Sequence, residues 1–197
     1  LFDVTTGTEL FKLTASDASA GDSFGFSVAV SGDRALVGAY HGTDDLGVDS
    51  GSAYVFTRTF VTWTEQQKLL PSDPESGDAF GYAVAISGDT AIVSGHGNDD
   101  SAFNSGSAYV FTQTSGTWSE QQKLLPDDGM MSDSFGFSVA IQGETVIVGA
   151  DLDDHDADLD AGSAYVFTRS GLVWSQQQKL TADDYQEDTL TDAQGRF

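Results

Sequence analysis

The stretch GSAYVFT at residues 51–57 decides the fold, because the same seven residues return unchanged further along the chain. They stand again at 106–112 and at 162–168, so the copies are about 55 residues apart. A fixed spacing of this size is the signature of a repeat architecture, in which each copy is one structural unit. The sequence therefore predicts one continuous array and no separate domains.

Three further motifs recur with the same spacing and define the unit. They are EQQKLLP (65–71, 120–126 and, altered, 176–181), Asp-x-Phe-Gly (22–25, 78–81 and 133–136) and one tryptophan (Trp63, Trp118 and Trp174). We interpret residues 1–197 as a single repeat array. Its parts are a partial blade (1–20), three repeats (21–76, 77–131 and 132–187) and a divergent tail (188–197).

Each repeat is expected to contain four β-strands and no helix. In the first repeat, Phe26, Val28 and Val30 alternate with small residues, which is the period-two pattern of a strand. The remaining segments follow as a turn (31–33), a strand (34–39), a polar loop (40–50), two more strands (53–58 and 63–69) and a crossing (71–78). Four strands per unit is typical of a propeller blade. The prediction is an all-β, β-propeller-like array of four-stranded antiparallel blades.

The two faces of the predicted strands support blades that stack on one another. In the strand at 34–39, Leu36 and Val37 point to opposite faces and both are apolar. A sheet with one face in water would instead alternate apolar with charged residues. A β-sandwich of hairpins remains the alternative, although closely similar repeats favour radial or solenoidal stacking.

Composition excludes several classes of protein. The 197 residues include 8 Lys and Arg against 31 Asp and Glu, a net charge of −23. Nucleic-acid binding through phosphate contacts needs a basic face, and docking on anionic lipid needs basic residues too. No apolar run approaches the ~20 residues of a membrane span, so direct membrane insertion is not expected. The absence of Cys excludes disulfides, thiolate chemistry and Cys-ligated zinc.

The acidic residues gather in the loop after the second strand of each repeat. These candidate metal ligands are Asp44, Asp45 and Asp49 in the first loop, Asn98, Asp99, Asp100 and Asn104 in the second, and Asp151, Asp153, Asp154, Asp156, Asp158 and Asp160 in the third. Calcium takes about six to eight oxygen ligands from such side chains. We therefore predict a calcium site, strongest in the third loop; the alternative is a solvated acidic loop that keeps the protein soluble.

Other recurring residues have simpler interpretations. The aspartates before each Phe-Gly are expected to cap turns rather than bind metal, because Asp side chains accept hydrogen bonds from nearby backbone N–H groups. They are Asp17, Asp22, Asp73, Asp78, Asp128 and Asp133. The histidines His41, His96 and His155 are expected to be solvated loop residues. The periodic tyrosines (Tyr54, Tyr109 and Tyr165) and tryptophans are expected in the blade core.

The chain resembles the FG-GAP repeat family, found in integrin α-chain propellers and in bacterial surface proteins. Its Phe-Gly pairs stand at 24–25, 80–81 and 135–136, and its Gly-Ala steps at 38–39 and 149–150, with Ser-Gly at 94–95. The resemblance implies a propeller-like fold and an extracellular or cell-surface location. The proline that follows Gly-Ala in the family is absent. The integrin-type calcium loop also has no counterpart, because residues 31–33 are too few to enclose an ion.

No pattern indicates an enzyme, since no Gly-x-Ser-x-Gly elbow stands between a strand and a helix and nothing else assembles a nucleophile with a base. The sequence favours a non-enzymatic, extracellular calcium-binding module for adhesion or protein association. The alternatives are a self-assembling subunit of an extracellular fibre or surface layer and, third, a polysaccharide hydrolase or lyase. Expected partners are other protein chains, copies of this chain, or surface glycans.

The two ends of the sequence fall within the repeat. Residues 1–4 align with 55–58 of a third strand, and the Phe-Gly expected at 191–192 is missing. We therefore expect each end to offer what the other lacks, so that chains associate in a ring or as a fibre.

Overall fold

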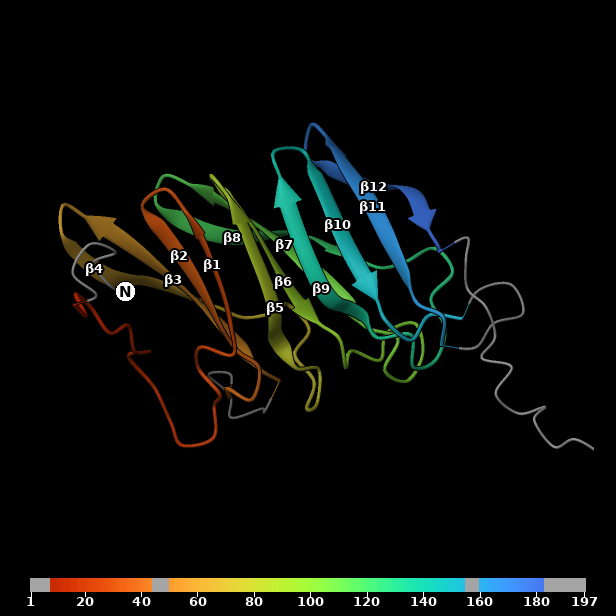
Figure 1. Ribbon diagram of the computed structural model, residues 1–197, viewed down its shortest axis with the longest axis horizontal. Helices are drawn as coiled ribbons and strands as arrows, with labels where there is room; N and C mark the ends of the chain where they lie inside the picture. Colours follow the sequence, from red (N-terminus) through yellow and green to blue (C-terminus); the bar gives the residue numbers. More distant parts are fainter. Residues whose placement is uncertain (1–7, 44–49, 155–159, 183–197) are drawn as a thin grey trace, which may run out of the picture.

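The computed structural model describes residues 8–43, 50–154 and 160–182 (Figure 1). Within these ranges the regular structure is entirely β. The strands are β1 (Ser27–Ser31), β2 (Arg34–Ala39), β3 (Ser52–Thr59), β4 (Thr62–Leu69), β5 (Phe80–Ser87), β6 (Thr90–Gly95), β7 (Ser107–Thr114), β8 (Thr117–Leu124), β9 (Phe135–Gln142), β10 (Thr145–Ala150), β11 (Ser163–Ser170) and β12 (Val173–Leu180). The prediction of an all-β chain is confirmed.

The strands form three antiparallel sheets of four, each made of consecutive strands. The first blade is β1–β4, the second β5–β8 and the third β9–β12, and they stand side by side in chain order (Figure 1). This arrangement confirms the propeller-like array of four-stranded blades. Among residues 8–20 of the partial blade, one isolated bridge occurs at Glu9 and no strand forms.

A β-bulge recurs at the same place in every blade. The pairing of the third strand with the fourth shifts between Val55 and Phe56, and at the equivalent positions in the other two blades. A bulge leaves one extra residue in the fourth strand, so two consecutive side chains no longer have to point to opposite faces. In β4 these consecutive residues, Gln66 and Gln67, both reach the second blade.

The hydrophobic core lies between the blades. At the first junction Leu36, Val55 and Leu69 of the first blade pack with Val84 and Ile86 of the second. The second junction repeats the arrangement with the third blade. Because each sheet buries apolar side chains on both faces, a central blade needs a neighbour on each side.

The Phe-Gly motif locks neighbouring blades together. The Phe80 N–H donates to the Ser50 carbonyl at 2.7 Å, and the Ser27 hydroxyl donates to the Gly81 carbonyl at 2.7 Å. Gly81 has φ +93°, and a Cβ there would lie 2.3 Å from the Ser52 carbonyl oxygen. Only glycine permits both the backbone conformation and the close approach.

Candidate functional site

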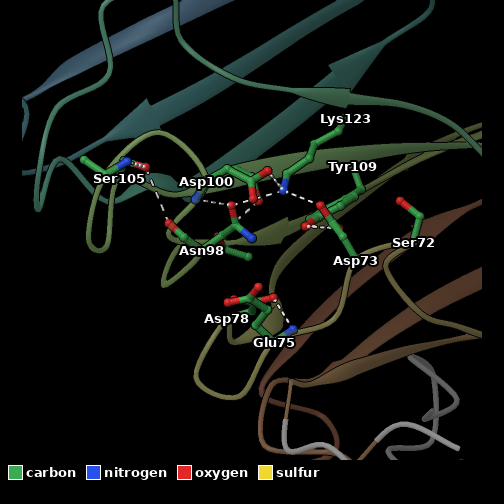
Figure 2. Close-up of polar contacts among 12 residues, drawn as sticks. Ser72, Asp73, Glu75, Asp78, Asn98, Asp100, Ser105, Tyr109 and Lys123 are labelled. Carbon is green, nitrogen blue, oxygen red and sulfur yellow. Dashed lines mark hydrogen bonds and ion pairs between the residues drawn. The ribbon is translucent and has the colours of Figure 1, made fainter. Parts of the chain in front are cut away.

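A group of polar contacts in the second blade joins an aspartate, a tyrosine and a lysine (Figure 2). The Tyr109 hydroxyl donates to Asp73 Oδ1 at 2.9 Å, and Lys123 Nζ lies 2.8 Å from Asp73 Oδ2. The same ammonium stands 5.0 Å from the centre of the Tyr109 ring, within cation–π range. We call these three residues the second Asp–Tyr–Lys node.

The other two blades contain the same node. In the first, Asp17 accepts from Tyr54 at 2.8 Å and pairs with Lys68 at 2.7 Å. The third contains Asp128, Tyr165 and Lys179, with distances of 3.0 Å for Tyr–Asp and 2.7 Å for Lys–Asp. Threefold repetition with unchanged partners indicates that the node is part of the blade's structure.

The ionisation of the node follows from these contacts. Burial alone would raise the pKa of Asp73, but hydrogen bonds from Lys123 and Tyr109, together with the ammonium charge, hold it below 3.8. Burial raises the pKa of Tyr109 well above its ordinary value. At neutral pH the node therefore holds a carboxylate, an ammonium and a neutral phenol, and the phenol is unsuited to act as a base.

One loop position next to the node differs between blades. The N–H groups of Gly51, Gly106 and Gly162 donate to the carbonyls of Gly42, Asn98 and Asp153 respectively, so these three acceptors are equivalent. The second-blade residue, Asn98, is 2% exposed. Its Oδ1 accepts from Lys123 Nζ at 3.1 Å and from the Asp100 N–H at 3.2 Å (Figure 2).

In the third blade this position carries a buried carboxylate. Asp153 is 1% exposed and accepts hydrogen bonds from the hydroxyls of Tyr165, at 2.7 Å, and Ser163. Its Oδ2 also lies 2.7 Å from Lys179 Nζ. Lys179 thus faces two carboxylates, Asp128 and Asp153, just as Lys123 faces Asp73 and Asp100 in the second blade. The third node differs because Asp153 is buried, whereas Asp100 is exposed.

The aspartates before the Phe-Gly motifs have two distinct roles. Asp22, Asp78 and Asp133 each accept a hydrogen bond from the backbone N–H three residues earlier, at 2.6, 2.8 and 2.5 Å. The predicted turn cap is therefore confirmed for these three. The turn-cap prediction does not describe the main contacts of Asp17, Asp73 and Asp128. Their carboxylates instead bind the tyrosine and lysine of the Asp–Tyr–Lys nodes.

Burial changes the turn caps of the second and third blades, because it raises the pKa of Asp78 as well as that of Asp133. Asp133 is 2% exposed, and burial raises its pKa above 3.8, with the nearby charges of Asp153 and Asp154 acting in the same direction. The Met130 N–H and Lys179 oppose this shift without reversing it. The single positive charge of Lys179 thus compensates only part of the negative charge around Asp133.

The predicted calcium ligands fall into three groups. Asp44, Asp45, Asp49, Asp156 and Asp158 lie outside the described residues. Several others are held within the protein: Asp99 and Asp154 accept from the N–H groups of Asn104 and Asp160, at 2.6 and 2.7 Å, and Asp100 pairs with Lys123. Asp151 is exposed. Across residues 8–43, 50–154 and 160–182, no three acidic or histidine side chains converge as metal ligands, so the calcium site stays a prediction.

An aromatic row crosses the blades beside the acidic loops. Phe26 and Tyr82 are 5.0 Å apart between ring centres, and Tyr82 and Phe137 are 5.5 Å apart. His96 stacks on Tyr82 at 3.9 Å, is half-buried, and has a pKa lowered by that burial. The expectation of a solvated histidine is therefore wrong for His96, whereas it holds for the exposed His41, and His155 lies outside the described residues.

The sequence contains a signal for the Asp–Tyr–Lys node, although the repeated motifs alone do not predict the node. The aspartate precedes its tyrosine by 36 or 37 residues in every blade. The repeat predicts the tyrosines in the core, and they are buried, at 2, 0 and 0% exposure. The hydroxyl at the end of the ring needs a polar partner when buried, and that need could have pointed to the aspartates.

Comparison with known proteins identifies the repeat. The family described as FG-GAP repeat matches residues 8–56, 63–111 and 118–167, which is well over half of the chain. No curated protein matched. Among solved structures, the chain is similar to one described as the crystal structure of the Saccharomyces cerevisiae Sqt1, with a TM-score of 0.51 and 9% identity, covering 83% of this chain and 37% of that one. At this identity the likeness concerns the fold alone.

In the part of the chain described, no helix is long and apolar enough to cross a membrane.

Proposed function

The chain belongs to the FG-GAP repeat family, and from that premise we propose that it is a non-enzymatic module that associates with other proteins outside the cell and binds calcium through its third acidic loop. The observation that carries the proposal is the contrast between the repeated nodes and the third loop. The nodes use their buried polar groups in the same way three times. An active site usually breaks such symmetry with polar residues of its own.

The calcium part of the proposal rests on the acidity of the third blade. Asp153 places a buried carboxylate where the other blades have Gly42 and Asn98. Beside it, Asp128 and Asp133 share the single ammonium of Lys179. The adjoining loop adds Asp151, Asp154, Asp156, Asp158 and Asp160. A hard cation with oxygen ligands would relieve the repulsion among these carboxylates.

The calcium proposal is tested by thermal unfolding with excess calcium and with a chelator. Bound calcium should raise the stability by about 2.7 kcal/mol at a hundredfold excess over Kd. The double variant Asp156→Ala/Asp158→Ala should lose this shift. Asp44→Ala/Asp45→Ala removes the same charge from the first loop and should keep most of it. A parent protein whose melting curve is unchanged by the chelator would contradict calcium binding.

The absence of enzymatic activity and the extracellular location need separate measurements. Incubation with soluble polysaccharides should release no products, and turnover would instead support the hydrolase or lyase alternative. Antibodies applied to intact source cells should label the protein without permeabilisation. Labelling that appears only after permeabilisation would contradict a cell-surface location.

A further inference from the structure

Equivalent faces of the blades differ sharply in exposure. At the first junction Val84 and Ile86 are each 8% exposed, whereas Val28 and Val30, which hold the same positions in the first blade, are 70 and 68% exposed. We call the surface around Val28 and Val30 the leading face. It borders a cavity of about 980 Å³, which is also lined by Leu13, Ala35 and Val37.

Among the described residues, no blade packs on the opposite side of the third blade. Ile147 and Leu180 are each 41% exposed, while their equivalents Ile92 and Leu124 are buried at the second junction, at 0 and 1%. We call the surface around Ile147 and Leu180 the trailing face. Each internal junction joins a trailing face to a leading face, so the two open faces are the two halves of one more junction.

The Phe-Gly contact supports this correspondence. At the first junction Phe80 and Gly81 lie against Ser27, Gly38 and Ser52. The trailing face has a cavity of about 410 Å³ lined by the equivalent residues, among them Ser138, Gly149 and Ser163. On the leading face, Phe24-Gly25 is the matching motif. A Cβ on Gly25 would meet no atom within 4 Å, which shows that this motif is not engaged as Gly81 is.

A glutamine clamp gives the junction polar specificity. The Gln67 side chain donates to the Trp118 carbonyl at 2.8 Å and accepts from the Trp118 N–H at 2.9 Å. Gln122 clamps Trp174 with the same two distances. The next glutamine in the series, Gln178, is exposed on the trailing face, and the first tryptophan, Trp63, is half-buried on the leading face.

We propose that the trailing face of one copy of this chain binds the leading face of a second copy, head to tail, and reproduces the internal junction. Ile147 and Leu180 would cover Val28 and Val30, Gln178 would clamp Trp63, and Phe24-Gly25 would enter the cavity beside Gly149. This inference rests on the proposed role in protein association and names a second copy as the partner. Such a contact is heterologous, so it leaves one face free at each end and can extend into a fibre.

Residues before the first blade must give way to this partner. Leu13 packs against the leading face, where Leu69 packs at the first junction. Residues 8–14 form an isolated bridge at Glu9 and no strand, whereas β12 of a second copy arrives as part of a complete sheet. Only these residues have to move, because Ser16 and Asp17 hold the first blade as Ser72 and Asp73 hold the second. The segment also has Leu10 and Phe11 where β4 has Gln66 and Gln67, so it lacks the amides of the clamp. A complete blade can therefore displace it.

Charge sets the conditions under which the copies associate. Each copy carries a net charge of −23, so repulsion opposes association at low ionic strength. Across the first junction one ion pair joins Arg34 to Asp89 at 2.9 Å. The third blade has Thr145 at the position of Arg34, so the proposed contact is apolar with neutral amides and requires no calcium. Association should therefore strengthen with sodium chloride in the presence of a chelator, which separates this inference from the calcium proposal.

The experiment is sedimentation velocity over a dilution series, in chelator and sodium chloride, with complementary variants of the full chain. Val28→Asp disables the leading face and Ile147→Asp the trailing face. Each variant alone should sediment near the monomer mass of 20.8 kDa, whereas a one-to-one mixture should form a dimer through the two intact faces. Phe60→Asp, at a side chain 94% exposed in the turn between β3 and β4, is the matched control and should associate like the parent.

The outcomes distinguish the possibilities. A parent chain that is monomeric at all concentrations, or a mixture that stays monomeric, would overturn the inference. Circular dichroism checks that the variants fold. If Ile147→Asp does not fold, Gln178→Ala tests the trailing face instead. This variant should weaken association about tenfold, because it removes two hydrogen bonds of the clamp. Association that persists while calcium has no effect on melting would overturn the calcium proposal alone.

Discussion

The internal junctions and the open end faces present nearly the same side chains in opposite surroundings. Val84 is 8% exposed because the first blade covers it, and Val28 is 70% exposed because no described blade does. The two residues occupy the same position in equivalent strands. The contrast teaches that burial here depends on the neighbouring blade, so one substitution at equivalent positions should have different effects.

The largest expected difference is between Val84→Asp and Val28→Asp. Val84→Asp places a charge without a partner in the first junction and should lower the free energy of unfolding by about 4 kcal/mol or more. Val28→Asp changes an exposed side chain and should alter it by less than about 0.5 kcal/mol. Urea unfolding at low ionic strength and high dilution, where copies of the chain are expected to be apart, measures both. Equal losses would show that the leading face is covered in solution.

A smaller difference is expected between Gly81→Ala and Gly25→Ala. Both glycines have positive φ, +93° and +90°, so each alanine is strained by about 1–2 kcal/mol. Only at Gly81 would the new Cβ also strike a neighbouring carbonyl, that of Ser52. We expect Gly81→Ala to cost about 2 kcal/mol more in unfolding free energy. Matching costs, measured by the same urea unfolding, would indicate that Gly25 is already engaged in a junction.

The smallest effect concerns the two turn caps Asp133 and Asp22. Burial raises the folded-state pKa of Asp133 above 3.8, so its ionised form is disfavoured in the folded protein. Asp133→Asn keeps an acceptor for the Met130 N–H and should stabilise the protein at pH 7 by up to about 1 kcal/mol. As the pH falls through the raised pKa, the parent carboxyl becomes protonated and the advantage should disappear.

Asp22→Asn is the matched control for this measurement. Asp22 caps an equivalent turn but is only half-buried. The reason lies at the second junction, where the N–H groups of Ser132 and Ser134 bond to the second-blade loop at Phe103 and Asn104. Thermal melts from pH 3 to pH 8 should show no comparable stabilisation for Asp22→Asn. A pH-independent effect of Asp133→Asn would show that charge is not the cause.

The blades could be predicted from the sequence because their signals are local and repeated. The alternation of Phe26, Val28 and Val30 defines a strand, and the return of GSAYVFT at 106–112 and 162–168 defines the period. The stacking of the blades could be predicted as well, since both faces of the strand at 34–39 carry apolar residues. These inferences use residues close together in the chain, where periodicity is informative.

The polar contacts of the site could not be predicted in the same way. The node joins Asp73 to Lys123, 50 residues away, and such pairing depends on how the crossing segment meets the fourth strand. The polar loop around His96 predicts a solvated side chain, yet Tyr82 of the neighbouring strand covers it. The calcium ligands were chosen by composition alone. Composition does not reveal that Asp99 and Asp154 would be used to hold their own loops.

The stacking of each blade only on its neighbours has a consequence for the order in which the protein opens. In the described ranges, the second blade has a blade packed on both sides, whereas the first and third each have a blade on one side only. In such one-dimensional arrays, stability is the sum of the units and their contacts, so the ends fray first. Amide hydrogens of β6 and β7 should therefore exchange with solvent more slowly than those of β1 or β12. Binding a further blade at either end would slow exchange there first and would extend the protected region outward from the middle.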